Sequence, residues 1–457
     1  MARLRDRSRG DDTLEEEPGP LQSAIPKSAA SVRAERASLV VLGAAAFMAQ
    51  ADARVIDALL HVISDDFKTA PARASIVISA YALPYGLFQL FYGPIGDRIG
   101  KLRVMMACLS FFSIGTFACG FVPNLASFAV LRFLTGVAAA AVVPMSLGYI
   151  GDKFPYETRQ IALGRFMSAL MMGQIAGATL GGVFGEFLGW RNVFFAFGVA
   201  AAIVSVLLAR ESRRFPEKQK TGKLFTPSMF TVPAGGSILF AGMVGAGPPL
   251  VTGILLTAGG AVLLYALATQ YGYILKRQSS KVILATVFTE GLFVFGGLAY
   301  LASSLTDRFG VAYSTAGLML AGFGVGGLFY SFSVKKLFTR IGDLGILLLG
   351  GALLGAAFVA IGLIPNWQSF IPLVIVLGMG FYTMHGTLQT RATEMAPEAR
   401  GAAISLFAFA FFMGQSVGPI ALGHILEARG YSAAFVTAGI GLIALALIGR
   451  TLFVQIR

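Results

Sequence analysis

The chain has 457 residues, of which 56% are hydrophobic and only 13% are charged, and its mean hydropathy is +0.74. This balance excludes a water-soluble globular protein, which could not cover so much apolar surface. The formal net charge of +13 does not require a nucleic-acid partner, because the cations are distributed as in the loops of a membrane protein.

The chain begins with a polar segment and continues as a series of apolar runs. Residues 1–37 have mixed charge and no apolar signal-peptide core, so we expect a disordered cytoplasmic tail. The apolar runs are long enough to cross a bilayer as helices. We expect these helices at 39–63, 73–96, 102–121, 126–150, 161–188, 192–210, 282–303, 315–334, 344–364, 370–390, 401–427 and 433–450.

These runs predict an all-α polytopic membrane protein with six-helix bundles at 38–214 and 281–457. Residues 215–280 between them are expected to be a cytoplasmic linker with an apolar insertion at 229–274, split by GAGPPL. Lysine and arginine flank the insertion on both sides, so it must cross the membrane an even number of times. The pattern favours two extra helices over an amphipathic or re-entrant segment.

Positive charge sets the predicted orientation. With both termini in the cytoplasm, the outer side receives few cations, namely Lys68, Arg73, Arg191, Arg308 and Arg429. Apart from Arg54, Arg132 and Arg165 within the predicted helices, the remaining lysines and arginines then lie in the cytoplasmic tail and loops, as the positive-inside rule requires. This distribution predicts a multi-pass protein of the plasma or inner membrane.

Two segments of the chain repeat each other: MMGQIAGATLGGVFGEFLGWRNVFFAFG at 171–198 and FMGQSVGPIALGHILEARGYSAAFVTAG at 412–439. They align without a gap at an offset of 241 residues. The aligned pairs are Gly173 and Gly414, Gln174 and Gln415, Gly177 and Gly418, and Glu186 and Glu427. A repeat of this kind implies a duplicated bundle in parallel orientation.

The turn after the second predicted helix reads GPIGDRIGK at 93–101 and has a weaker echo, TRIGDL, at 339–344. It matches the pattern G-x-x-x-D-R-x-G-R/K through Gly93, Asp97, Arg98, Gly100 and Lys101. With this motif, residues 38–210 and 281–451 resemble the major facilitator superfamily of secondary transporters.

The resemblance implies that this turn latches the two bundles in the outward-facing state, with Asp97 and Arg98 in that role. Candidate partners lie in YIGDKFPYETR at the next cytoplasmic turn, which contains Asp152, Glu157 and Arg159. The alternative is that the turn only anchors the topology by its positive charge, although an acid adds nothing to such an anchor.

Two further motifs resemble those of the family. LRFLTGVAAAAVVP matches its R-x-x-x-G pattern through Arg132 and Gly136. GQIAGATLGG resembles the antiporter pattern G-x-x-x-G-P-x-x-G-G but has Ala178 where proline is expected, a departure that counts against an antiporter. Glycines four residues apart are also typical of close helix packing.

The first predicted helix carries several polar side chains, which need a reason inside a bilayer. At 100° per residue, Gln50, Arg54, Asp57 and His61 form one stripe, expected to face a water-filled cavity. Asp52 lies on nearly the opposite side. Resemblance to proton–drug antiporters favours Asp52 as the proton carrier and periodicity favours Asp57, so both stay candidates. Arg54 and Asp57 could also form only a static ion pair.

Glu290 is the only acid within the seventh predicted helix. The repeat places it opposite position 49, so acids from the first helix of each bundle would flank one central cavity. His385 in the tenth helix is placed to reach this cavity, although a membrane histidine serves as often in a helix–helix hydrogen bond. Gln415 completes the candidate residues for protons or substrate.

We therefore expect a transporter that works by alternating access and couples protons to the export of an amphipathic drug or metabolite. The alternatives are proton-coupled uptake of a small organic anion held by Arg54 and Arg132, and flipping of a lipid or lysolipid. Without a metal cluster or nucleophile motif, we expect neither an enzyme nor a cofactor. The expected partners are protons, a small-molecule substrate and the bilayer, with no nucleic acid, and the chain is expected to be a monomer.

Overall fold

The computed structural model describes residues 29–154, 156–214, 231–243, 249–397 and 400–455. Within these ranges the chain is helical except for short turns, and no strand occurs among them. Eleven helical stretches are long and apolar enough to cross a membrane, and the last, Gly401–Gln455, is long enough for two crossings. The all-α polytopic fold with twelve core crossings is therefore confirmed.

The N-terminal bundle contains six crossings, of which several are interrupted. They are α1 (Ala29–Asp66), α2 (Pro71–Ala74) with α3 (Ile76–Ile99), α4 (Lys101–Ala118) with the short η1 (Cys119–Phe121), α5 (Leu125–Ala139) with α6 (Val142–Lys153), α7 (Tyr156–Val183) with the π-helical η2 (Phe184–Leu188), and α8 (Trp190–Arg214). Residues 29–37, expected to belong to a disordered tail, are helical and continue α1. Polar side chains do not stop a helix that leaves the apolar layer, and this stretch contains no proline or glycine.

The C-terminal bundle is built in the same way from α11 (Gln278–Leu298) with α12 (Leu301–Phe309), α13 (Tyr313–Leu363), α14 (Phe370–Ala392) and α15 (Arg400–Gln455). The long helices α13 and α15 each contain two crossings. The chain folds back at Gly342, with φ of 65°, and at Gly430, with φ of 82°. Both positions need glycine because these backbone angles are strained for other residues.

The apolar insertion forms two helices, α9 (Thr231–Met243) and α10 (Pro249–Leu275), which pack against each other. A Cβ atom at Gly235 of α9 would lie 2.8 Å from the backbone nitrogen of Leu263. On its other side α9 contacts the N-terminal bundle, where the rings of Phe240 and Phe133 stack with centroids 4.2 Å apart. The insertion is thus a pair of helices docked on a bundle, and its crossing of the membrane stays a prediction.

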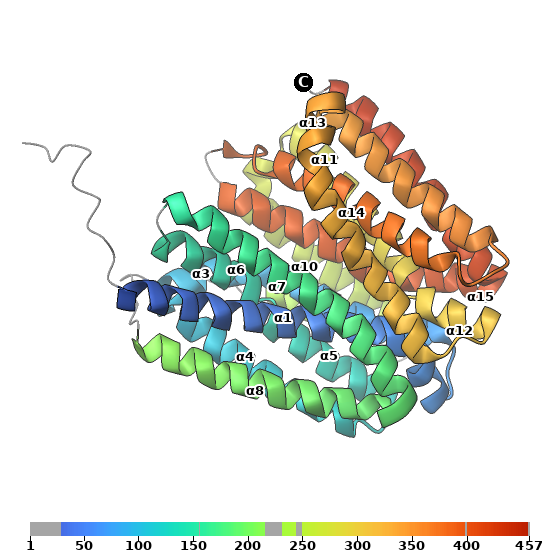
Figure 1. Cartoon of the computed structure of the whole chain (residues 1–457), viewed down its shortest axis with the longest axis horizontal. Coiled ribbons are helices and arrows are strands. Elements are labelled where there is room, and N and C mark those ends of the chain that lie inside the picture. The colour runs from blue at the N-terminus through green and yellow to red at the C-terminus, as the bar shows by residue number, and fades with distance from the viewer. Residues whose placement is uncertain (1–28, 155, 215–230, 244–248, 398–399, 456–457) are drawn as a thin grey trace, which may run out of the picture.

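The two bundles are inclined to each other and meet near α12 (Figure 1). We call this end of the molecule, where α1 ends and α13 begins, the α12 end. The opposite end, where α1 begins and α15 finishes, is the tail end. In Figure 1 the N-terminal bundle, blue to green, runs along the long axis, and the orange and red helices lie above it and slant down toward α12.

Close packing of α7 on α1 depends on the glycines of the repeat. A Cβ atom at Gly173 would come closer than 3.0 Å to the carbonyl oxygen of Phe47, and one at Gly177 would do so to that of Ala51. Only hydrogen fits between these backbones. The glycines four residues apart therefore serve close helix contact here.

The C-terminal bundle repeats this packing between α15 and α11. A Cβ atom at Gly414 would meet the carbonyl oxygen of Phe288, and one at Gly418 that of Leu292, again closer than 3.0 Å. Each glycine and each carbonyl partner lies 241 residues after its counterpart in the first half. The internal repeat is therefore preserved at the level of individual atomic contacts.

We expect Gly177→Ala to lower the melting temperature of the detergent-solubilised protein by several degrees. The added methyl group must separate α7 from α1, and such overpacking costs about 1–3 kcal/mol. Gly164→Ala is the matched control on the same helix, because a Cβ atom there meets nothing within 4 Å. Alanine favours helices, so this control should melt at or above the wild-type temperature. Equal melting of both variants would contradict the packing role of Gly177.

Candidate functional site

A buried ion pair joins the first and fourth crossings of the N-terminal bundle. Nη1 of Arg132 on α5 lies 2.6 Å from Oδ2 of Asp52 on α1, and Nη2 donates to the Asp52 carbonyl oxygen at 3.1 Å. Neither side chain is more than 1% exposed. The Arg132 guanidinium also lies 4.2 Å from the centroid of the Tyr81 ring. The Nη atoms of Arg132 therefore bind inside its own bundle, whereas its Nε atom has no partner among the described residues.

The opposite face of α1 points toward the C-terminal bundle. Nη1 of Arg54 lies 3.3 Å from Oδ2 of Asp57, and its guanidinium stacks 4.2 Å from the centroid of the Phe295 ring on α11. A cavity of about 30 Å³ between the bundles is lined by both residues and by Gln174 of α7. This volume accommodates a single water molecule. The two faces expected from the helical period are thus separate sites, and Arg54 and Asp57 do form an ion pair.

Glu290 and His385 form the corresponding polar contact in the C-terminal bundle. Oε2 of Glu290 on α11 lies 2.9 Å from Nδ1 of His385 on α14. The Glu290 side chain is 0% exposed, and its other oxygen, Oε1, has no partner among the described residues. As in the N-terminal bundle, an acid on the first crossing faces a nitrogen base on the fourth. Here, however, the base can itself lose a proton.

Aromatic rings enclose the Glu290–His385 contact. The imidazole centroid lies 5.0 Å from that of Phe381, 5.3 Å from that of Phe407 and 4.5 Å from that of Phe411. These rings provide an apolar surrounding for a carboxyl group that lacks a permanent cation nearby. An ionised carboxylate is costly in such a place unless water or a ligand reaches it.

The two glutamines named from the sequence lie in different bundles. Gln50 is half-buried on α1, where α7 approaches at Gly173. Gln415 is buried on α15, and its backbone nitrogen lies against Gly291 of α11, next to Glu290. Oε1 of Gln415 has no partner among the described residues. It is therefore a buried hydrogen-bond acceptor on the helix that packs against α11.

Polar contacts connect the two bundles at the α12 end. Ser79 of α3 and Ser416 of α15 each donate to the other's carbonyl oxygen, at 2.6 and 3.2 Å. Oε2 of Glu186 accepts a hydrogen bond from the backbone nitrogen of Ser314 at 2.8 Å. Nδ1 of His61 lies 3.0 Å from Oδ1 of Asp307. These contacts hold the bundles together at this end.

The residues of the predicted latch lie at the tail end. Nζ of Lys101 lies 2.6 Å from Oδ2 of Asp152, which links α4 to α6 within one bundle. Gly100, with φ of 105°, forms the turn before Lys101. Arg159 donates to the carbonyl oxygen of Phe154.

Arg98 is half-buried, and its Nη1 atom has no partner among the described residues. Gly93 and Asp97 lie in α3. Their environment, like that of Glu157, is outside the described part of the structure. The proposed contact of Asp97 with the second bundle is therefore untested.

The C-terminal bundle contains the same link with opposite charges. Asp343, which aligns with Lys101 in the echo TRIGDL, pairs with Nη2 of Arg391 at the end of α14. We call Lys101–Asp152 and Asp343–Arg391 the two bracket pairs. Sequence analysis missed the second pair, although the alignment of DRIGKL with TRIGDL already placed an acid opposite a lysine.

The arrangement defines a duplicated membrane transporter: two equivalent helical bundles, held together at one end, with buried ionisable pairs near their interface. Comparison with known proteins gives the family. A model of the major facilitator superfamily matches residues 42–311 and 283–457, and the chain belongs to this superfamily.

Relatives and a solved structure agree with this assignment. The chain is 25% identical to the MFS-type transporter YceJ of Bacillus subtilis over 385 residues, which cover 83% of this chain and 87% of YceJ. It is 25% identical to the multidrug resistance protein Stp of Mycobacterium tuberculosis over 414 residues, covering 87% and 76%. A crystal structure of a bacterial homologue of the human lysosomal transporter Spinster superposes with a TM-score of 0.67 at 17% identity, covering 93% of this chain and 98% of that one.

Proposed function

We propose that this transporter exports amphipathic drugs or metabolites in exchange for protons, and that Glu290 with His385 carries the proton. The observation behind this proposal is a fully buried carboxyl group that faces a titratable base, with one oxygen left without a partner. A proton shared by the two groups removes the cost of a bare charge. A cationic or polar substrate bound next to Glu290 would offset the same cost by supplying a charge or a hydrogen-bond donor.

Competition between proton and substrate would then couple their movements. When the pair holds the proton, the site is neutral. The transporter can then change between its two states without an ionised carboxylate in an apolar surrounding. When the proton leaves, the carboxylate needs a replacement charge or dipole, which the substrate supplies. Each ligand would shift the same conformational equilibrium, as alternating access requires.

The contacts of Arg132 argue against the alternative of anion uptake. Arg132 gives two hydrogen bonds to Asp52 and stacks on Tyr81, and it is 1% exposed. An anion would have to displace Asp52 to reach it. Arg54 is less enclosed but already pairs with Asp57. These two residues therefore do not form the pair of cavity-facing arginines that uptake of an anion would need.

The distribution of positive charge suggests which state the molecule is in. If both termini lie in the cytoplasm of a plasma or inner membrane, the α12 end faces outward. The contacts of Ser79, Glu186 and His61 with the other bundle would then close the outer side. Closure of the outer side belongs to the half of the transport cycle in which cargo enters from the cytoplasm. The multidrug resistance name of Stp fits such cargo.

The test uses proteoliposomes with an acidic interior and an enclosed pH dye. Cationic, neutral and anionic amphiphiles are added outside one class at a time, with protein-free vesicles as the control. We expect cationic or neutral compounds to drive protons out of the vesicles. Proton movement only with anions, and inward together with the solute, would instead identify an uptake symporter.

A further inference from the structure

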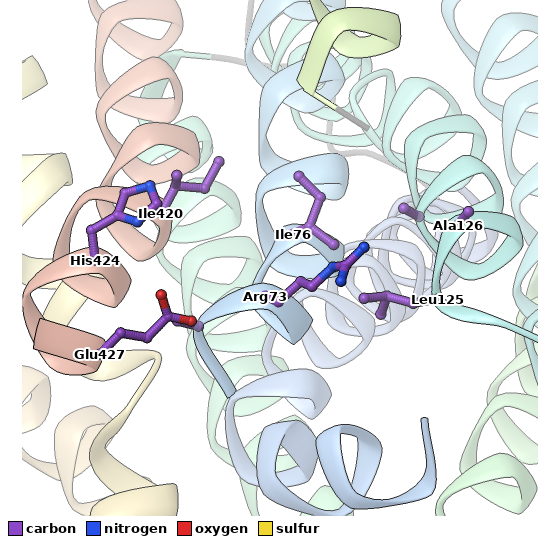
Figure 2. Close-up of a pocket in the computed structure, with 9 residues that line it drawn as sticks. Arg73, Ile76, Leu125, Ala126, Ile420, His424 and Glu427 are labelled. Carbon is purple, nitrogen blue, oxygen red and sulfur yellow. The ribbon is translucent and has the colours of Figure 1, made fainter. Parts of the chain in front are cut away.

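A second cavity, of about 430 Å³, lies between the bundles at the α12 end, away from the buried pairs. One wall comes from the start of α2, α3 and α5, and the other from α15 (Figure 2). Its apolar lining includes Ile76, Leu125 and Ile420. The size is typical of cavities that hold small organic ligands, about 300–1,000 Å³.

Opposite charges stand on the two walls of this cavity. Arg73 and Glu427 are both exposed. Figure 2 shows Arg73 extending toward Leu125 and Ala126 of α5, whereas the Glu427 carboxylate extends from α15 on the other side. Among the described residues, no ion pair joins the two side chains. A molecule between the walls can therefore contact a cation and an anion at once.

The equivalent interface on the other side of the molecule is joined by a direct hydrogen bond. By the repeat offset of 241, Glu186 corresponds to Glu427 and Ser314 to Arg73. Glu186 accepts directly from the Ser314 nitrogen at 2.8 Å, a contact that has no counterpart between Glu427 and Arg73 among the described residues. The two equivalent interfaces therefore differ in this contact, and the 430 Å³ cavity lies at the one that lacks it. At that interface a ligand can take the place of the missing protein contact.

We propose that this cavity binds a phospholipid whose headgroup carries both a phosphate and a primary ammonium group. Arg73 would bind the phosphate and Glu427 the ammonium, since both are charge-assisted hydrogen bonds. The acyl chains would lie on the apolar lining formed by Ile76, Leu125 and Ile420.

Position in the membrane favours this occupant over a soluble one. The cavity lies where several crossings begin or end: α2 begins at Pro71, α5 begins at Leu125, and α15 turns at Gly430. This is the level at which lipid headgroups meet the hydrocarbon layer. A lipid with only an anionic headgroup would satisfy Arg73 and leave Glu427 without a partner.

The experiment measures lipid retained by the full chain after reconstitution into vesicles of equimolar phosphatidylethanolamine and phosphatidylglycerol. The protein is extracted in a mild detergent and the bound lipids are quantified by mass spectrometry. We expect wild type to retain phosphatidylethanolamine in at least fivefold excess. Arg73→Gln should lower retention of both lipids, and Glu427→Gln should remove the preference between them. Arg429→Gln, a nearby change outside the lining, should behave like wild type.

A second readout separates binding from damage to the fold. Short-chain phosphatidylethanolamine added to detergent-solubilised protein should raise the melting temperature of wild type and Arg429→Gln, but not of Glu427→Gln. No headgroup preference in wild type, or the same preference in all variants, would overturn the proposal. A stabilising effect of cationic amphiphiles but not of the lipid would also overturn it, because the cavity would then belong to the transport path.

Discussion

Replacing Glu290 by glutamine is expected to reduce drug-driven proton efflux from proteoliposomes to the level of protein-free vesicles. Glutamine keeps the size and the hydrogen-bonding capacity toward His385, 2.9 Å away, but cannot take up or release a proton. Substrate binding should survive, because glutamine preserves the size and polarity of the side chain. The measurement is the dye-reported proton flux, together with equilibrium binding of the same cationic compound to the purified protein.

Two conservative variants show whether the loss of proton flux is due to the missing carboxyl group. Glu290→Asp keeps a carboxyl group and should retain part of the flux, because the shorter side chain lengthens the contact with His385. His385→Gln keeps a polar partner but removes the titratable base, so it should slow proton transfer without abolishing binding. If Glu290→Gln still moves protons at the wild-type rate, the proton carrier must be sought at Asp52 or Asp57.

Breaking the buried ion pair should cause the largest loss of stability. Arg132→Met leaves the Asp52 carboxylate at 0% exposure without a cation, and removing one partner of a buried pair typically costs about 3–5 kcal/mol. We expect a sharp fall in the melting temperature and in the yield of monodisperse protein from size-exclusion chromatography. The double variant Asp52→Asn, Arg132→Met should recover much of this loss, because no bare charge stays buried.

An exposed ion pair in the same bundle provides the comparison. Nη1 of Arg191 lies 2.7 Å from Oδ2 of Asp66, with both side chains more than a third exposed. Water can solvate the carboxylate left by Asp66, so Arg191→Met should cost at most about 1 kcal/mol. If the double variant at the buried site is no more stable than Arg132→Met, the loss comes from packing against Tyr81 and not from the unpaired acid.

The crossings could be predicted from the sequence because hydropathy and length alone nearly determine a helix in lipid. The period of α1 also separated Asp52 from the face of Arg54 and Asp57, since 100° per residue fixes directions within one helix. The contacts between helices could not be derived in this way. Glu290 and His385 are 95 residues apart, and nothing local to either one indicates the other.

Two other features depended on interactions that the hydropathy pattern and the motif do not reveal. Residues 29–37 looked like a disordered tail because they are polar, yet helical hydrogen bonding continues where α1 leaves the apolar layer. The second bracket pair was hidden because its charges are reversed. A search for the motif's lysine finds no match at position 343, whereas a search for a link between two helix ends would have found Asp343.

The reversed polarity of the bracket pairs bears on how a duplicated chain avoids assembling wrongly. The glycine contacts between α7 and α1 closely resemble those between α15 and α11. A helix of one half could therefore pack on a helix of the other. At the tail end such an exchange would bring Lys101 against Arg391, or Asp343 against Asp152. Like charges would then meet where the correct assembly has opposite ones. The reversed bracket pairs thus disfavour an exchange of helices between the two halves.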